Sequence, residues 1–204
     1  MKSMYIGSGD TSALLAGLNT KSHKNLLQRF VSDEIPYYSA VSSPIDALRT
    51  GVILESRYLL TLDSSYYEQV KSVCNELDVL KSTIDFAKLE NGKIIDFDEL
   101  KTANFDDFLL IQKGGLGYVK KKYKNNYNQV QFQLLCTGLK SANLVFLVVY
   151  TYEDEVNQER DIQENEIIQF RIERDEDVIN KIKERASIFQ TIKDFYNVVQ
   201  RKTC

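Results

Sequence analysis

Apolar residues recur along the chain with the periods of helices and strands, and the first third predicts mainly helices. Residues 7–31 begin with small residues and continue into apolar positions at helical spacing. Residues 45–60 predict a stronger helix, because Ser43 can cap it and Pro44 suits its first position. Residues 65–77 predict a continued helix or irregular structure.

The centre of the chain predicts a β-hairpin. Residues 82–104 contain a strand, a tight turn at Asn91 and Gly92, and a second strand. Asn-Gly is a strong hairpin signal, because both residues accept the left-handed backbone conformation that a two-residue turn requires. The following residues, 105–127, combine a short apolar run with a loop rich in glycine and lysine.

The last third predicts two strands between two helices. Residues 125–139 predict a helix, the apolar run at 144–150 a buried strand, and the alternation at 164–174 a half-exposed strand. Residues 175–200 predict a long amphipathic helix. Its apolar stripe consists of Ile179, Ile182, Ala186 and Phe189.

This order of elements predicts an α/β (α+β) fold, with a central sheet covered by helices. The length fits a single domain over residues 1–204. Within it we expect an N-terminal helical part at about 1–78, a sheet core at about 79–174 and a C-terminal helix at about 175–201.

The composition predicts an intracellular, cytoplasmic protein. The longest apolar run has the length of a strand, so we expect no membrane partner. The first ten residues contain no hydrophobic signal core, so we expect no export. Three scattered cysteines fit reduced thiols better than a disulfide framework or a zinc site.

Charge is distributed unevenly, although the net charge is only −3. Residues 113–124 contain five lysines and no acid, whereas residues 153–177 contain eleven acids and three arginines. Binding of nucleic acid depends on such local patches rather than on the net charge. The lysine run therefore favours a nucleic-acid contact, and a solvated loop is the alternative.

Glu55 is the first candidate for chemistry. It lies on the apolar stripe of the helix predicted at residues 45–60, together with Val52 and Leu59. A carboxylate on a core-facing stripe is costly unless it is paired or binds a metal ion. The alternative is a glutamate at the edge of the stripe that reaches water or pairs with Arg49 or Arg57.

Three charged residues of the hairpin form the second candidate site. Glu99 and Lys101 share one face of their strand, and Asp85 of the partner strand can approach Glu99. Two nearby carboxylates repel unless a cation lies between them, and an oxygen-rich pocket suits Mg²⁺ or Mn²⁺. A lysine beside such an ion can orient a metal-bound water. The alternative is an exposed hairpin face with a cross-strand ion pair.

Four segments follow one another in an order that resembles a known family. They are a small-residue segment, a helix with an acid, a hairpin with an acid and an E-x-K pair, and a helix with two glutamines: IGSGDTSALLAGLNTKS, ALRTGVILESRYLL, LKSTIDFAKLENGKIIDFDELKT and YKNNYNQVQFQLLCTG. Over about residues 6–154 the sequence resembles the PD-(D/E)xK nucleases, and more narrowly the phage lambda-type exonucleases and YqaJ-like viral recombinases. The resemblance implies a restriction-endonuclease-like core, in which a central mixed β-sheet is flanked by helices.

The resemblance also implies roles for the residues of the candidate site. Asp85 and Glu99 would ligate a divalent ion, Mg²⁺ or Mn²⁺, with the main-chain carbonyl of Leu100 completing the shell. Glu55 would ligate a second ion or hold its water. Lys101 would position the attacking water.

Further residues are implied to brace this site or to bind DNA. Gln129 and Gln133 lie one helical turn apart, on one face, and would brace the site or touch the substrate strand. The remaining DNA contacts would come from Ser8 or Ser12, Arg49, Lys120, Lys121 and Lys122.

As a whole, the resemblance implies a metal-dependent deoxyribonuclease, an exonuclease that acts on duplex DNA ends in recombination. A phage protein of this kind would work in the host cytoplasm with a single-strand annealing protein, and its relatives imply a homo-oligomer. Two alternatives stay open. One is an endonuclease of the same superfamily, of restriction or junction-resolving type, and the other is a non-catalytic DNA-binding protein that keeps the fold.

Overall fold

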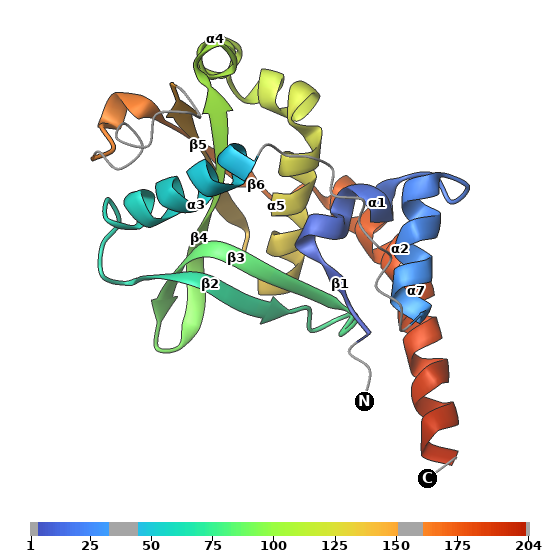
Figure 1. Ribbon diagram of the computed structural model, residues 1–204. Coiled ribbons are helices and arrows are strands. Elements are labelled where there is room, and N and C mark those ends of the chain that lie inside the picture. The colour runs from blue at the N-terminus through green and yellow to red at the C-terminus, as the bar shows by residue number, and fades with distance from the viewer. Residues whose placement is uncertain (1–3, 33–44, 151–160, 203–204) are drawn as a thin grey trace.

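The computed structural model describes residues 4–32, 45–150 and 161–202, whose arrangement Figure 1 shows. At residues 45–49 and 200–202 the backbone alone is described. The elements in chain order are β1 (Ile6–Gly7), η1 (Ser8–Asp10), α1 (Thr11–Leu15), α2 (Lys21–Val31), α3 (Ile45–Leu59), β2 (Tyr66–Val73), β3 (Leu80–Glu90), β4 (Lys93–Asn104), α4 (Phe105–Lys122), α5 (Lys124–Thr137), β5 (Ser141–Val149), η2 (Glu164–Glu166), β6 (Ile167–Glu173) and α7 (Glu176–Lys202).

The predicted hairpin is the centre of a mixed sheet. Strands β3 and β4 pair antiparallel around Asn91 and Gly92, whose φ angles of 50° and 74° are the left-handed values that an Asn-Gly turn requires. Strand β5 runs parallel to β4, and β6 runs antiparallel to β5. Strand β3 also pairs with β2 in antiparallel and with β1 in parallel orientation. The predicted fold class is therefore confirmed.

Strand β5 is the most deeply buried strand of the sheet. All its residues after Ser141 are buried, because β4 and β6 cover its edges and helices cover its faces. The continuous apolar run at residues 144–150 correctly predicted this environment.

Helices cover the sheet on both faces (Figure 1). On one face, α4 and α5 pack onto a cluster that includes Ile84 and Phe146. On the opposite face, α3 packs through Leu54 and Tyr58 onto Leu100 and its neighbours. The sheet thus separates α3 from α5, and a residue of β4 faces one helix or the other according to its parity.

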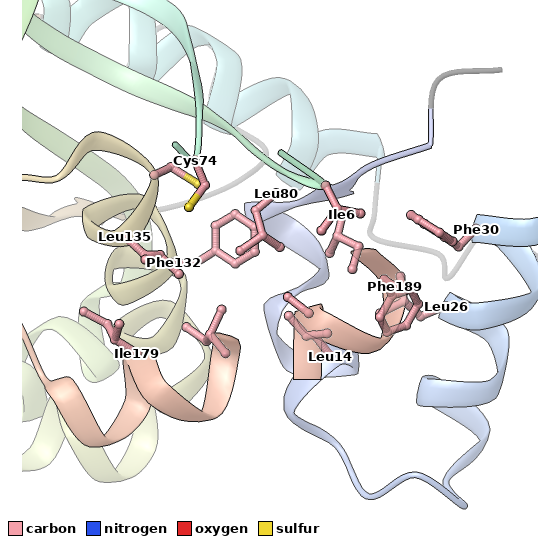
Figure 2. Close-up of a cluster of buried hydrophobic side chains, with 14 of the residues drawn as sticks. Ile6, Leu14, Leu26, Phe30, Cys74, Leu80, Phe132, Leu135, Ile179 and Phe189 are labelled. Carbon is pink, nitrogen blue, oxygen red and sulfur yellow. The ribbon is translucent and has the colours of Figure 1, made fainter. Parts of the chain in front are cut away.

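A helical layer beside β1 completes the core (Figure 2). Side chains of α1, α2 and α7 meet Leu80 of β3 and Phe132 of α5 in one apolar cluster. The stripe predicted for the closing helix is confirmed, because all its members are fully buried in this cluster: Ile179, Ile182, Ala186 and Phe189.

The prediction for residues 65–77 is wrong, because this segment contains strand β2. Few of its side chains are buried, and its backbone pairs along the edge of β3 from Tyr66 to Val73. Backbone pairing with β3, rather than the pattern of apolar side chains, therefore makes this segment a strand. With β1 and β2 inside it, the part at 1–78 is not purely helical.

The loop predicted within residues 105–127 is also wrong. Helix α4 continues through the glycines to Lys122 and bends at Gly115, whose φ of 58° is a left-handed value that glycine adopts without strain. The predicted caps Ser43 and Pro44 lie outside the described residues. In the part of the chain that the structure describes, no helix is long and apolar enough to cross a membrane.

The substitution Phe189→Ala is expected to lower the free energy of unfolding by about 3–5 kcal/mol. Its ring is fully buried and meets Phe30 and His23 edge to face, so its loss leaves a cavity between α2 and α7. Urea unfolding measures the change. The control is Phe195→Ala on the same helix, where the ring is 70% exposed and a change of about 0.5 kcal/mol or less is expected. Equal losses would contradict this assignment of the core.

Candidate active site

The two strands of the hairpin separate near the middle of the sheet. Strands β3 and β4 are paired from their turn as far as Phe86 and Asp98. Beyond this pair β4 continues along β5, whereas β3 continues along β2 and β1. We call the opening between β3 and β4 beyond the Phe86–Asp98 pair the fork. Because the two backbones no longer bond each other there, side chains must satisfy the polar groups that line it.

Asp85 is the first residue of β3 inside the fork. Its Oδ2 accepts a hydrogen bond from the Leu100 N–H at 3.0 Å, so a side chain replaces the ladder bond. In a regular strand the side chains two residues apart lie on the same face. Here Ile84 packs beneath α5 whereas Phe86 packs against α3, so the alternation of side chains along β3 is interrupted at Asp85. On β2, Gln69 lies opposite with a left-handed φ of 54°. The irregular backbone coincides with the residue that the sequence singled out.

Glu99 is held inside the fork by one ammonium group and two amides. Its side chain is fully buried. Lys101 Nζ donates to Oε1 at 2.6 Å, and Gln129 Nε2 donates to the same oxygen at 2.5 Å. Gln133 Nε2 donates to Oε2 and, at 3.3 Å, to the Thr83 carbonyl of β3. Two glutamines of α5 therefore close the fork from one face.

The hydrogen bonds of the two glutamines match one of the two roles expected for them, which is to brace the site. Both Gln129 and Gln133 brace Glu99. Gln133 is also fully buried, and a contact between it and the substrate strand stays a prediction. Glu99 and Lys101 face the same side of β4, as their spacing predicts.

Glu55 approaches the fork from the opposite face. Helix α3 turns Leu54 inward, whereas Val52, which the sequence placed on the buried stripe, is 63% exposed. Glu55 is half-buried at the edge of the true stripe. Burial raises the pKa of Glu55, Asp85 raises it further and Lys101 lowers it, so these three groups interact electrostatically.

Burial raises the pKa of the carboxyl groups in the fork. Burial raises the pKa of Glu99 to about 7. The attraction of Lys101 lowers this pKa, and repulsion from Asp85 raises it. The pKa of Asp85 is also raised by burial, against Lys101 and the Leu100 N–H. Burial alone would lower the pKa of Lys101, but Glu99 and Asp85 outweigh it and raise this pKa, so its ammonium group stays charged. One ammonium group does not balance two carboxylates, of which Glu99 is fully buried and Asp85 is partly buried.

The donors at the fork fit a hard divalent cation. Among the described side chains, no three His, Cys, Asp or Glu groups converge closely enough to enclose an ion by themselves. Mg²⁺ is usually bound by one or two carboxylates and keeps several waters, so Asp85, Glu99 and the Leu100 carbonyl are a suitable oxygen set. A cation there would favour the ionised form of both carboxyl groups, whose pKa burial has raised.

The serines expected to bind phosphate lie in the first turns after β1. Ser8 is buried in η1, and its carbonyl accepts a hydrogen bond from Thr11 Oγ1 at 2.5 Å. Ser12 is exposed on α1. The side chain of Arg49 lies outside the described residues.

The lysines expected to bind DNA are exposed in the last turn of α4: Lys120, Lys121 and Lys122. Lys120 Nζ lies 5.0 Å from the centre of the Tyr127 ring. It also lines a cleft of about 510 Å³ together with acids that include Glu173 and Asp175. Within the described residues, no hydrogen bond or ion pair joins these lysines or the two serines to the fork.

Sequence reasoning missed a buried polar group on the other face of β4. Asp98 accepts hydrogen bonds from the Tyr58 hydroxyl and from Asn143 Nδ2, each at 2.7 Å. All three residues are buried. Burial raises the pKa of Asp98, against these two hydrogen bonds. Asn143 was the available signal, as a polar residue at the start of an otherwise apolar strand.

Comparisons with known proteins place this fold among exonucleases. No protein-family model and no curated protein matches the chain. The alkaline exonuclease from Laribacter hongkongensis is 16% identical, with a TM-score of 0.62 over 98% of this chain and 93% of that enzyme. A phage related exonuclease from Haemophilus somnus 129PT is 15% identical, with a TM-score of 0.63 over 98% of this chain and 96% of that protein. The chain therefore has the fold of these exonucleases along nearly its whole length.

Metal-free protein is expected to lose stability as the pH rises from about 4.5 to about 7 through the titration of Glu99. In this pH range the folded protein keeps a proton on Glu99 that the unfolded chain has already released. The stabilisation that this proton provides is therefore complete below the pKa of the unfolded chain, and it is lost as the pH rises through the pKa of the folded protein. Urea unfolding in the presence of a chelator measures this loss, which Glu99→Gln should abolish. Glu90→Gln, at the exposed end of β3, is the control. Parallel pH profiles for wild type and Glu99→Gln would contradict the raised pKa.

Proposed function

We propose that this protein is a metal-dependent deoxyribonuclease of the lambda-type exonuclease family, within the PD-(D/E)xK superfamily. The observation that carries the proposal is the fork, where Asp85, Glu99 and Lys101 gather at the opening between β3 and β4. A fold shared with two exonucleases along nearly the whole chain supports the same assignment. The proposed reaction is hydrolysis of phosphodiester bonds from the ends of duplex DNA.

The metal ion, Mg²⁺ or Mn²⁺, would be held by Asp85, Glu99 and the carbonyl of Leu100. Glu55, on the opposite side of the fork, would hold a second ion or its water. When bound, such an ion polarises a phosphoryl oxygen and lowers the pKa of a coordinated water. The remaining tasks fall to the side chains of the protein.

Lys101 would serve the attacking water and the phosphate. Its raised pKa keeps the ammonium group charged at neutral pH. The side chain is 26% exposed while that of Glu99 is fully buried, so solvent reaches part of Lys101. A positive group in this place offsets the negative charge that develops on the phosphate in the transition state, and its N–H groups can orient a water.

Gln129 and Gln133 would keep Glu99 in one orientation. Each donates to a different oxygen of the carboxylate, which fixes its plane. Gln133 also bonds the Thr83 carbonyl on β3, so the same amide ties both sides of the fork. A ligand held in this way reorganises little when it binds an ion.

The substrate would be duplex DNA, bound through residues outside the fork. Ser8 or Ser12 would contact a terminal phosphate, and the DNA backbone would meet Arg49 and the lysines Lys120, Lys121 and Lys122. A homo-oligomer, a single-strand annealing protein as partner and a phage setting in the host cytoplasm complete the proposal. These last points rest on the sequence resemblance.

The substitution Lys101→Met is expected to slow DNA hydrolysis by about 10²–10³-fold, the usual effect of removing a charge-stabilising donor. Asp85→Asn and Glu99→Gln should cost at least as much, because each removes a charged ligand. Release of nucleotides from linear duplex DNA in Mg²⁺ or Mn²⁺ measures the rate, and a chelator should abolish it. Glu90→Gln is the matched control, since Glu90 is exposed at the hairpin end. Intact duplex after incubation with wild type across a range of salt would contradict the proposal.

Closed circular duplex DNA is expected to survive conditions that degrade a linear duplex of the same sequence. An exonuclease requires an end, and a closed circle offers none. Gel electrophoresis of both substrates side by side measures the difference. Nicking or linearisation of the circle at a comparable rate would instead support an endonuclease of the same superfamily.

A further inference from the structure

A row of hydrogen bonds crosses the sheet on the face that α3 covers. Asp98, Asn143 and Arg171 are direct neighbours on β4, β5 and β6. Asn143 Nδ2 donates to Asp98 Oδ1 at 2.7 Å, and Arg171 Nη1 donates to Asn143 Oδ1 at 3.1 Å. The same nitrogen of Arg171 donates to both oxygens of Asp96, at 2.7 and 2.9 Å. Asp98 is therefore held in place from the β6 side of the sheet.

The row ends on helix α3. The Tyr58 hydroxyl donates to Asp98 Oδ2 at 2.7 Å, and both residues are at most 3% exposed. The Tyr58 ring also packs edge-on against Phe86, with ring centroids 5.3 Å apart, and Phe86 is the direct neighbour of Asp98 across the hairpin. Apolar contacts alone are compatible with several rotations of α3 about its axis. A hydrogen bond is directional, so the bond between Tyr58 and Asp98 selects one of these rotations.

Both partners of this bond adjoin the candidate active site. On α3, Glu55 precedes Tyr58 by three residues, which places the two about one helical turn apart. On β4, Asp98 directly precedes Glu99 and faces the opposite side of the strand. One buried hydrogen bond thus connects the two elements that carry Glu55 and Glu99.

We propose that Tyr58 and Asp98 are positioning residues of the metal site. Their hydrogen bond fixes where α3 presents Glu55 to the fork and where β4 presents Glu99. The inference rests on the proposed function, because it concerns the divalent ion that the fork would bind. Neither residue touches that ion, and both act through the elements they join. Residues that hydrogen-bond a metal ligand typically change metal affinity by roughly 10- to 100-fold when removed. Because Tyr58 and Asp98 act through the elements that carry the ligands, we expect an effect at the lower end of this range.

The first test removes a single oxygen atom. Tyr58→Phe keeps the ring against Phe86 and deletes the bond to Asp98. Calorimetric titration with Mn²⁺ should show roughly 10-fold weaker binding. The Mn²⁺ concentration that gives half-maximal hydrolysis of linear duplex should also rise, whereas a general loss of folded protein lowers the maximal rate without changing this concentration. Tyr66→Phe is the control, since Tyr66 packs against the same cluster and, among the described residues, its hydroxyl group makes no hydrogen bond.

The second test separates the hydrogen bond from the charge. In Asp98→Asn the new amide can accept from Asn143 through its oxygen and donate to the Tyr58 oxygen through its nitrogen, so both contacts persist. If position is what Asp98 provides, this variant should bind Mn²⁺ nearly as tightly as wild type. An affinity loss as large as that of Tyr58→Phe would overturn the positioning role, because the negative charge would then be the active property.

The outcomes distinguish this inference from the proposed function. Mn²⁺ binding that Glu99→Gln abolishes and Tyr58→Phe leaves unchanged overturns the inference alone. Wild-type protein that binds no Mn²⁺ overturns both. Weakened binding in Tyr58→Phe, with near wild-type binding in Asp98→Asn and Tyr66→Phe, supports the assignment.

Discussion

A buried carboxylate needs donors around it, and this requirement organises the centre of the molecule. Glu99 is fully buried, and its oxygens accept from Lys101, Gln129 and Gln133. These donors come from β4 and α5, so the carboxylate ties a helix to the sheet where the strands stop bonding each other. Asp85 lies beside Glu99, and the positive charge of Lys101 balances only one of the two carboxylates. A divalent cation would supply the remaining positive charge.

The fold creates this environment by dividing the neighbours of two strands. Near their turn, β3 and β4 bond each other; further on, each bonds a different partner. The fork that results faces α5 on one side of the sheet and α3 on the other. The parity of β4 then distributes consecutive residues, with Asp98 facing α3 and Glu99 facing α5. A site assembled from β3, β4, α5 and α3 thus follows from one departure in sheet pairing.

Local signals in the sequence predicted the hairpin, the buried strand and the closing helix, because turn chemistry and apolar period determine these elements. Strand β2 escaped prediction, since its backbone pairing with β3 is a tertiary effect. For the candidate site, the family resemblance and strand parity brought Asp85, Glu99 and Lys101 together. The Tyr58–Asp98 bond could not be foreseen, because the rotation of α3 depends on packing against Phe86 rather than on helical period alone.

The central proposal is that the fork binds a divalent cation between Asp85 and Glu99. Crystals of the protein soaked in Mn²⁺ test it most directly, through anomalous scattering from the metal. The account predicts a peak within bonding distance of both carboxylates, which is lost in crystals of Asp85→Ala. Well-ordered carboxylates with no peak between them at saturating Mn²⁺ would contradict it.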